Sequence, residues 1–253
     1  MERYFVMRLA LISTPRSGNT WVRKFLASAL FLEQDAVHDW RDVSPPLPTR
    51  YILQVHWYRE PQFLDWLNEN GFTPVVIARH PLDVLISILR FAKYEPQTSR
   101  WLEGAGKLPV DLGQANPTSK RFLDWAVGPG AENLLSVSYA WWQDEAAFRL
   151  KYEDAIFNPE ETFGRLLRAA DPEFTPDGRA SALLHKRIFE ELQHAPNKHA
   201  WQGQPGLWKQ VIASRDARRI GLRHQPVFDL LGYRAESWFV SRASARRRWD
   251  AVK

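Results

Sequence analysis

The chain has 253 residues and an ordinary globular composition, with 45% hydrophobic and 25% charged residues. This length suits one sizeable α/β core or two small domains, and no linker forces a division. The formal net charge of +5 favours anionic ligands in general but identifies none. The chain has no cysteine, which excludes disulfides and thiolate metal sites and is compatible with the cytoplasmic setting that we expect. No apolar run approaches the roughly 20 residues that span a bilayer, so we expect no transmembrane segment.

The stretch from Arg8 to Trp21 predicts a strand, a tight loop and a helix. Leu9 to Ile12 form an unbroken apolar run, which is typical of a parallel strand buried on both faces. Residues 14–20 are small and polar, and apolar side chains then recur at helical spacing. The free backbone N–H groups and the dipole of a helix N-terminus make such a loop a suitable anion site. Arg16 adds a side-chain cation to it.

This loop is not that of the nucleotide triphosphatases, because Gly18 is its one glycine and no Gly-Lys pair is present. Thr14-Pro-Arg-Ser-Gly-Asn-Thr-Trp21 instead resembles the loop of sulfotransferases that use 3′-phosphoadenosine 5′-phosphosulfate (PAPS), commonly written Pro-Lys-Ser-Gly-Thr-Thr-Trp. Small polar turns that open helices are common, so the motif alone also fits a purely structural loop. The resemblance implies that Trp21 stacks on adenine and that the phosphosulfate contacts Pro15, Arg16, Ser17, Gly18, Asn19 and Thr20.

Strand and helix patterns alternate along the next part of the chain. Tyr51 to His56 predict a short strand, Pro61 begins a helix that ends at Asn70-Gly71, and residues 73–78 predict another buried strand. We interpret residues 33–50 as a surface connection. Alternation of this kind predicts βαβ units. We therefore expect a single-domain α/β fold with a central parallel sheet flanked by helices. The resemblance implies, in addition, a P-loop-like phosphosulfate-binding loop after the first strand.

In parallel sheets, ligands bind beyond the carboxyl ends of the strands, where Thr14, His56 and Arg79 are expected to lie. By position alone, His56 fits a hydrogen-bonded structural histidine at least as well as a catalytic one. Gln54-Val-His56 resembles the Lys-Thr-His segment of the same sulfotransferases. The resemblance implies that His56 is the general base that deprotonates the acceptor hydroxyl. Gln54 replaces the lysine that is thought to steady the leaving oxygen, which puts that role in doubt.

The segment from Arg79 to Ser87 is the second strong motif. Pro81 opens a helix whose apolar stripe leaves Asp83 and Ser87 on another face, so Arg79 and Ser87 could flank one anion. A surface arginine and a solvated serine are the alternative. The segment resembles the family's 3′-phosphate motif, in which a serine follows an arginine after eight positions. The resemblance implies that Arg79 and Ser87 hold the 3′-phosphate, for which the arginine fork is well suited.

Two later segments extend the resemblance over residues 8–233. Tyr152-Glu-Asp154 is similar to a family segment whose tyrosine approaches the adenosine, and we expect its two carboxylates to make structural hydrogen bonds. Asn158-Pro-Glu-Glu161 predicts a capping box that opens another helix. Trp201 to Lys209 resemble a Gly-rich segment, but Trp201 and Gln202 replace an Arg-Lys pair that grips the 3′-phosphate. The residues implied at the nucleotide are Tyr152, Trp201, Gln202 and Gly203.

Three regions carry weaker patterns. Residues 93–130 are rich in Gly and Pro and predict a lid or acceptor loop within a domain of residues 1–233. Their aromatic residues Trp101, Phe122 and Trp125 fit an acceptor pocket and a private core equally well. Residues 134–147 predict a helix and residues 148–151 a strand. The basic tail, residues 234–253, fits a terminal helix packed on its own domain better than a contact with an anionic membrane surface.

Several resemblances in the same order are far more specific than one. They imply a PAPS-dependent sulfotransferase that needs no metal, releases adenosine 3′,5′-bisphosphate (PAP) and uses His56 and Arg16 in catalysis. We expect the acceptor to be a hydroxyl or amine of a small molecule, glycan or lipid, and no nucleic-acid partner. A P-loop-like nucleotide kinase and a non-catalytic nucleotide- or polyanion-binding module are the alternatives. The sequence identifies neither the acceptor nor the oligomeric state.

Overall fold

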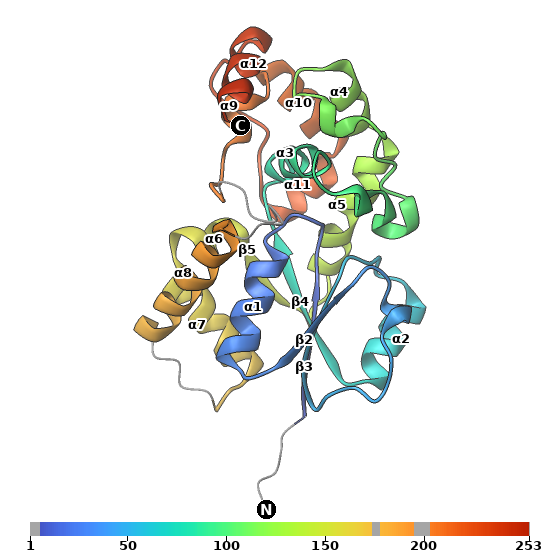
Figure 1. Cartoon of the computed structure of the whole chain (residues 1–253), viewed down its shortest axis with the longest axis vertical. Coiled ribbons are helices and arrows are strands. Elements are labelled where there is room, and N and C mark those ends of the chain that lie inside the picture. Colours follow the sequence, from blue (N-terminus) through green and yellow to red (C-terminus); the bar gives the residue numbers. More distant parts are fainter. Residues whose placement is uncertain (1–5, 174–177, 195–202, 253) are drawn as a thin grey trace, which may run out of the picture.

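The computed structural model describes residues 6–173, 178–194 and 203–252. Within these residues, five strands form one sheet in the order β2–β3–β1–β4–β5, and every neighbouring pair is parallel (Figure 1). The predicted α/β fold with a central parallel sheet is therefore confirmed. The strands are β1 (Met7–Ile12), β2 (Glu33–Val37), β3 (Arg50–Val55), β4 (Phe72–Ala78) and β5 (Phe148–Lys151).

Helices cover both faces of the sheet and build a helical cap beyond the carboxyl ends of its strands (Figure 1). On the faces lie α1 (Asn19–Ala29), α2 (Pro61–Glu69), α5 (Pro129–Trp142), α6 (Tyr152–Phe157), α7 (Pro159–Ala170) and α8 (Gly178–His194). The cap contains α3 (Pro81–Phe91), α4 (Lys120–Ala126), α9 (Trp208–Val211), α10 (Ser214–Arg223), α11 (Gln225–Leu231) and α12 (Arg242–Ala251). Short 3₁₀ turns span Trp40–Asp42 and Leu112–Gln114, and Pro96–Gly104 contains 3₁₀ turns that are interrupted by non-helical backbone at Trp101, Leu102 and Glu103.

The central strand β1 shows how the sheet separates two apolar cores. Leu9 and Leu11 pack into the core that α1, α7 and α8 cover, whereas Ala10 and Ile12 pack into the core on the opposite face. This alternation follows from the two-residue period of a strand. Because both faces are buried, the whole run is apolar, as the sequence predicted.

The interpretation of residues 33–50 as a surface connection was wrong, because they contain the strand β2. This strand pairs only with β3, at the edge of the sheet, and its first four residues are exposed. A strand with so little buried surface carries no apolar alternation from which to predict it. The 3₁₀ turn at Trp40–Asp42 follows it.

Helix boundaries also differ from the prediction. The helix expected over residues 134–147 is α5, which begins earlier at Pro129 and ends at Trp142. The predicted capping box at Asn158 was wrong, since its side chain makes no cap hydrogen bond. Asn158 closes the unpredicted helix α6 with its own N–H, which donates to the Asp154 carbonyl (2.7 Å), and α7 begins immediately afterwards. Asn158 is therefore both the last flanking residue of α6 and the first flanking residue of α7, and its backbone conformation lies outside the usual N-cap region.

The sequence left open whether the aromatic residues of region 93–130 line a pocket or form a core, and the structure shows both. Phe122 is fully buried and Trp125 nearly so, and both belong to the core on the α5 face of the sheet. Trp101 also packs there but lines the large cavity described below. Only Trp101 of the three therefore reaches that cavity.

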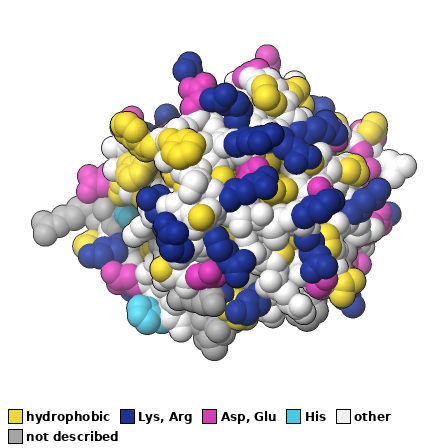
Figure 2. All heavy atoms as spheres, turned by 90° about the horizontal axis from the view of Figure 1, so that it is seen from above, with side chains coloured by type: hydrophobic (Ala, Val, Ile, Leu, Met, Phe, Trp, Pro, Cys, Tyr) yellow, Lys and Arg dark blue, Asp and Glu magenta, His cyan; other side chains and the backbone are white. Residues whose placement is uncertain are grey.

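The basic C-terminal segment forms α12, which packs against α9. Ala245 is buried, and Arg242 donates two hydrogen bonds to the buried Asp216 carboxylate of α10, at 2.8 and 2.7 Å. A terminal helix packed on its own domain was the favoured prediction, and it is confirmed. Lys and Arg side chains cover much of the face seen from the α12 end (Figure 2). No helix within the described ranges is long and apolar enough to cross a membrane.

Candidate functional site

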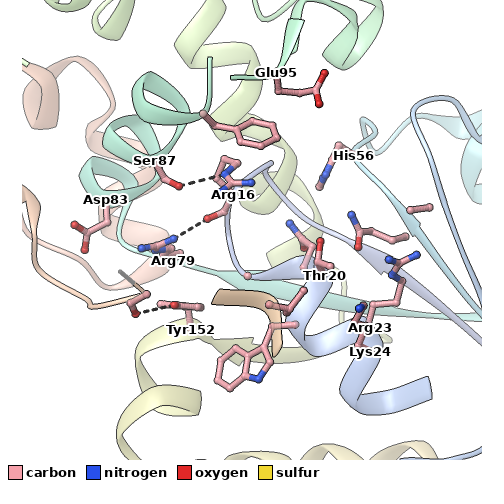
Figure 3. A pocket seen from close by; sticks show the side chains of 18 of the residues that line it. Arg16, Thr20, Arg23, Lys24, His56, Arg79, Asp83, Ser87, Glu95 and Tyr152 are labelled. Atoms are coloured by element: carbon pink, nitrogen blue, oxygen red, sulfur yellow. Dashed lines mark hydrogen bonds between the residues drawn. The ribbon is translucent and has the colours of Figure 1, made fainter. Parts of the chain in front are cut away.

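A cavity of about 480 Å³ opens where the strands of the sheet end and the helical cap begins (Figure 3). Its walls come from segments far apart in the sequence, as expected for a ligand site at the carboxyl edge of a parallel sheet. Most of the lining is contributed by Arg16, Gly18, Asn19, Thr20, Trp21, Arg23, Lys24, Val37, His38, Gln54, His56, Arg79, Asp83, Ser87, Phe91, Glu95, Trp101, Tyr152, Phe189, Gly203 and Leu207.

Buried hydroxyl groups hold the loop between β1 and α1 in place. The Ser138 hydroxyl donates to the Ile77 carbonyl (2.9 Å) and accepts from the backbone N–H of Thr14 (2.8 Å). The Thr14 hydroxyl donates to the Leu134 carbonyl (2.9 Å), and the Ser13 hydroxyl accepts from the Ile77 N–H (2.6 Å). The start of the loop is thus tied to β4 and α5, which makes it a rigid base for the residues that follow.

Gly18 brings this loop into direct contact with Tyr152. It adopts φ of +98°, where side chains are disfavoured, and a Cβ built on it would lie 2.6 Å from Tyr152 Cδ2. Both constraints require glycine. The contact joins the first loop to the residue that follows β5.

We expect Gly18→Ala to lower the free energy of unfolding by about 2–4 kcal/mol, combining backbone strain of roughly 1–2 kcal/mol with overpacking against Tyr152. Gly71→Ala is a matched control, because Gly71 also has a positive φ (+66°) but no atom lies within 4 Å of its built Cβ. Denaturant unfolding of both variants separates the two costs. Equal losses would show that the Tyr152 contact constrains nothing.

Two arginines meet between the loop and α3 (Figure 3). Arg16 Nε donates to the Ser87 hydroxyl (3.2 Å), and its guanidinium lies 4.1 Å from the Phe91 ring centroid. Arg79 Nη1 donates to the Arg16 carbonyl (2.9 Å), and its guanidinium lies 4.3 Å from the Tyr152 ring centroid. These contacts orient both guanidinium groups toward one region of the cavity.

The electrostatics of this pair favour an anion. Burial, followed by repulsion from Arg79, lowers the pKa of Arg16 to about 9. A negative group between the two guanidiniums would offset both effects, since opposite charge stabilises the protonated form. Arg79 Nε is buried without a hydrogen-bond partner among the described residues. The arrangement is therefore a suitable phosphate or sulfate site.

His56 follows the end of β3 and lies at the cavity wall (Figure 3). Its Nδ1 lies 2.7 Å from the Ser13 carbonyl, which can only accept, so Nδ1 carries the proton. Burial lowers the pKa of His56 to about 4, with smaller contributions from His38 and Arg16 against the raising effect of the Ser13 bond. The ring is therefore neutral at pH 7, and its Nε2 holds the lone pair of a general base.

The segment that contains Gly203 is anchored from two sides. The Tyr152 hydroxyl donates to the Gly203 carbonyl (2.7 Å). The buried Asp83 carboxylate of α3 accepts from the backbone N–H groups of Gly206 (2.6 Å) and Trp208 (3.0 Å). Burial raises the pKa of Asp83, while nearby Arg79 and these N–H groups act in the opposite direction. Asp83 thus positions a loop that lies over 100 residues away in sequence.

Several solved structures resemble most of the chain. Mouse sulfotransferase SULT7A1 complexed with PAP matches with a TM-score of 0.64 and 14% identity over 88% of this chain and 84% of that one. Retinol dehydratase with androsterone and the inactive cofactor PAP gives a TM-score of 0.59 and 15% identity over 87% and 80% of the two chains. Retinol dehydratase with retinol and PAP gives 0.60 and 14% over 87% and 81%. No protein-family model and no curated protein sequence matches the chain.

The chain has the sulfotransferase fold. Identities of 14–15% establish the fold and leave the activity of this chain to be inferred from its own residues. The fold brings together residues that the sequence motifs predicted from separate segments. His56, Arg79, Ser87 and Tyr152 all line the same cavity, together with much of the first loop.

Some residues predicted from the motifs lie elsewhere in this sulfotransferase fold. Pro15 and Ser17 are buried in the loop and do not line the cavity. Trp21 does line it but is only 3% exposed, and its Nε1 donates to the His185 carbonyl (3.1 Å), which leaves little ring surface for stacking. Trp201 and Gln202 fall outside the described residues, so their assignment stays a prediction from the sequence.

Residues next to the motifs have structural functions in the sulfotransferase fold. As expected, the Glu153 carboxylate makes structural hydrogen bonds, accepting from the His80 N–H (2.9 Å) and the Tyr233 hydroxyl (2.6 Å). His80 caps α3, with Nδ1 accepting from the Leu82 N–H (3.3 Å) and Nε2 next to the Arg234 carbonyl (3.0 Å). Both ring nitrogens of His80 are thus engaged, one in capping α3 and the other next to the segment that follows α11.

The sequence motifs missed one wall of the cavity in this sulfotransferase fold. Arg23 and Lys24 of α1 and His38 after β2 line it, as do Phe91 and Glu95 on the other side of His56. A signal for the first two was present, because positions three and four after Thr20 share a helix face with it. The contribution of His38 depends on β2, which the sequence did not reveal.

Proposed function

We propose that the protein is a PAPS-dependent sulfotransferase, which transfers a sulfuryl group to a hydroxyl or amine of its acceptor. One observation supports this most: Arg16, Arg79 and Ser87 lie together in a cavity that is also lined by His56, whose Nδ1 lies against the Ser13 carbonyl. The sulfotransferase fold of PAP-bound proteins adds independent support.

The residues fit the donor by the chemistry of their polar atoms. Arg79 and Ser87 would hold the 3′-phosphate, and the loop with Arg16 would hold the phosphosulfate. The buried Arg79 Nε, which has no partner in the described part of the chain, can donate to such a ligand. Tyr152, fixed by its bond to Gly203, would lie beside the adenosine.

In the reaction, the donor supplies a sulfuryl group bonded to a good phosphate leaving group. His56 Nε2 accepts the proton of the acceptor hydroxyl as that oxygen forms its bond to sulfur. Arg16 stabilises the charge that develops on the phosphate oxygen as the sulfur–oxygen bond breaks and PAP leaves with the electron pair. Catalysis then depends on positioning and charge stabilisation, as in phosphoryl transfer.

Mass spectrometry of the purified protein with PAPS and a panel of alcohols, phenols, sugars and amines tests this function. Transfer adds one sulfuryl group to an acceptor and releases an equal amount of PAP. Binding of PAP without transfer to any member of a broad panel would favour the non-catalytic nucleotide-binding module instead.

Activity is expected to survive EDTA, because this mechanism assigns the stabilisation of phosphate charge to arginine side chains. Turnover with and without EDTA, followed by addition of Mg²⁺, makes the measurement. Abolition by EDTA with rescue by Mg²⁺ would favour the nucleotide kinase alternative.

In the protein without bound donor, which kcat/KM for PAPS reports, the rate is expected to fall on the acid side near pH 4. This is well below the ordinary histidine pKa of about 6.5. A lowered pKa means that His56 loses its proton at lower pH, so the neutral base is present throughout the range above about pH 4. The kcat limb should lie higher, because a bound anionic donor raises the pKa of the ring. Rates from pH 4 to 8, with folding monitored by circular dichroism, check this. A kcat/KM limb near 6.5 in folded protein would contradict it.

A further inference from the structure

The cavity extends beyond the residues that the donor would occupy. Figure 3 shows Arg79 and Ser87 at one side of the cavity, Arg16 in the middle, and Arg23 and Lys24 of α1 at the other side. If the donor spans from Arg79 to the loop, the acceptor must approach from the side of Arg23. The lining of that side therefore carries information about the acceptor.

The cavity combines cationic lining on the Arg23 side with aromatic lining on the other side of His56. Arg23 and Lys24 lie one turn after Thr20 in α1. The N-terminus of this helix and both cationic side chains therefore line the same cavity. Phe91 and Trp101 also line the cavity and stack with ring centroids 6.0 Å apart and an interplanar angle of 6°. An occupant would meet apolar ring surface and positive charge together.

Arg23 is the clearest sign that an anion is expected here. Its Nε is buried and has no hydrogen-bond partner among the described residues. Burial lowers the pKa of Arg23, and Asp35 and Tyr51 offset this only in part. The Asp35 carboxylate already accepts a hydrogen bond from the Tyr51 hydroxyl (2.9 Å). A partly buried guanidinium with an unused donor is stabilised by an anionic ligand.

Gln54 provides a second polar atom without a hydrogen-bond partner among the described residues of the cavity lining. Its side chain is 9% exposed and lines the cavity, and its Oε1 has no partner within the described ranges. A hydroxyl group of a ligand would satisfy this oxygen by donating to it. The charge balance of the cavity also favours an anion. Among the described residues, four Arg or Lys side chains and two carboxylates line it, and one of these carboxylates, Asp83, is bonded to backbone N–H groups.

We propose that the acceptor is itself an anion: a hydroxyl compound whose carboxylate or phosphate group binds Arg23 and Lys24, with its apolar part against Phe91 and Trp101. This inference rests on the proposed function, since it takes the Arg79 side for the donor. It assigns Arg23 and Lys24 to acceptor recognition and leaves nucleotide binding to the loop and α3.

Thermal unfolding of the PAP-saturated protein with matched ligand pairs tests the inference. The pairs are 4-hydroxyphenylacetate with its neutral methyl ester, and glycerol 3-phosphate with glycerol. An anionic member is expected to raise the melting temperature more than its neutral partner, because ligands that bind only the native state stabilise it. The pair that shows the difference identifies carboxylate or phosphate as the recognised group. Absence of a difference in both pairs overturns the proposal.

The double variant Arg23→Gln/Lys24→Gln should remove the difference and weaken binding of the anionic member by about tenfold or more, the scale of lost charge-assisted contacts. Arg218→Gln/Arg219→Gln is the matched control, since it removes the same charge from the exposed surface of α10. If both double variants weaken binding equally, only the net charge matters and the proposal is wrong. If the double variant unfolds, the same difference between anionic and neutral ligand is measured in Arg23→Gln and in Lys24→Gln separately.

The shift caused by PAP alone separates this inference from the proposed function. PAP should stabilise the wild type and the Arg23→Gln/Lys24→Gln variant to a similar extent. A large loss of the PAP shift in that variant would place Arg23 and Lys24 at the donor and overturn the inference while leaving the sulfotransferase proposal intact. No PAP shift in the wild type would instead contradict the proposed function, and the ligand pairs are then measured on the nucleotide-free protein.

Discussion

Replacing His56 with alanine is expected to lower kcat by about two to four orders of magnitude, the usual contribution of a general base. The affinity for PAP should change little, because His56 lies toward the acceptor side, away from Arg79 and Ser87 (Figure 3). Turnover with PAPS and titration calorimetry with PAP measure the two quantities separately.

Two further variants make this result specific. His56→Asn keeps an N–H that can donate to the Ser13 carbonyl but has no basic nitrogen, so it should be as inactive as the alanine variant. His194→Ala removes an exposed histidine of α8 and should retain full activity. A kcat within a few-fold of wild type in both His56 variants would remove this residue from the mechanism.

The parts of the site that the sequence predicted share one physical origin. Arg16, His56 and Arg79 each follow an apolar strand pattern, and parallel strands place such positions at one edge of the sheet. Ser87 follows Arg79 by two helical turns, so the helix period fixes its direction. Local patterns and one topological rule were therefore sufficient to place these residues at one edge of the sheet, whereas their expected roles came from the family resemblance.

The parts that the sequence did not predict depend on distant contacts. Asp83 positions Gly206 and Trp208 through hydrogen bonds that span more than 120 residues of sequence, and no local pattern encodes them. The edge strand β2 has mostly exposed residues and is specified by its pairing with β3. Its position in turn brings His38 to the cavity wall. The strand β2 and His38 lie outside every motif, whereas Asp83, Gly206 and Trp208 lie within motifs that did not indicate their mutual contact.

Arg79→Ala is expected to weaken PAP binding by about tenfold to a hundredfold and to abolish the preference for PAP over adenosine 5′-phosphate. Arg79 is held by its bond to the Arg16 carbonyl and by the Tyr152 ring, and its Nε remains without a partner in the described part of the chain. Each charge-assisted bond contributes about 1.5–3 kcal/mol, and roughly 1.4 kcal/mol corresponds to a tenfold change. Melting-temperature shifts with the two nucleotides, followed by calorimetry, measure the effect.

Arg79→Lys separates the charge of this residue from its geometry. Lysine keeps the positive charge but cannot reproduce the planar fork that contacts the Arg16 carbonyl and a phosphate together, so it should bind PAP with intermediate affinity. Ser87→Ala should lose less than Arg79→Ala, because it removes a neutral hydroxyl. If Arg79→Ala still distinguishes PAP from adenosine 5′-phosphate as well as the wild type does, the 3′-phosphate lies elsewhere. In that case Arg79 has a structural function, and the donor lies in the cavity in another direction.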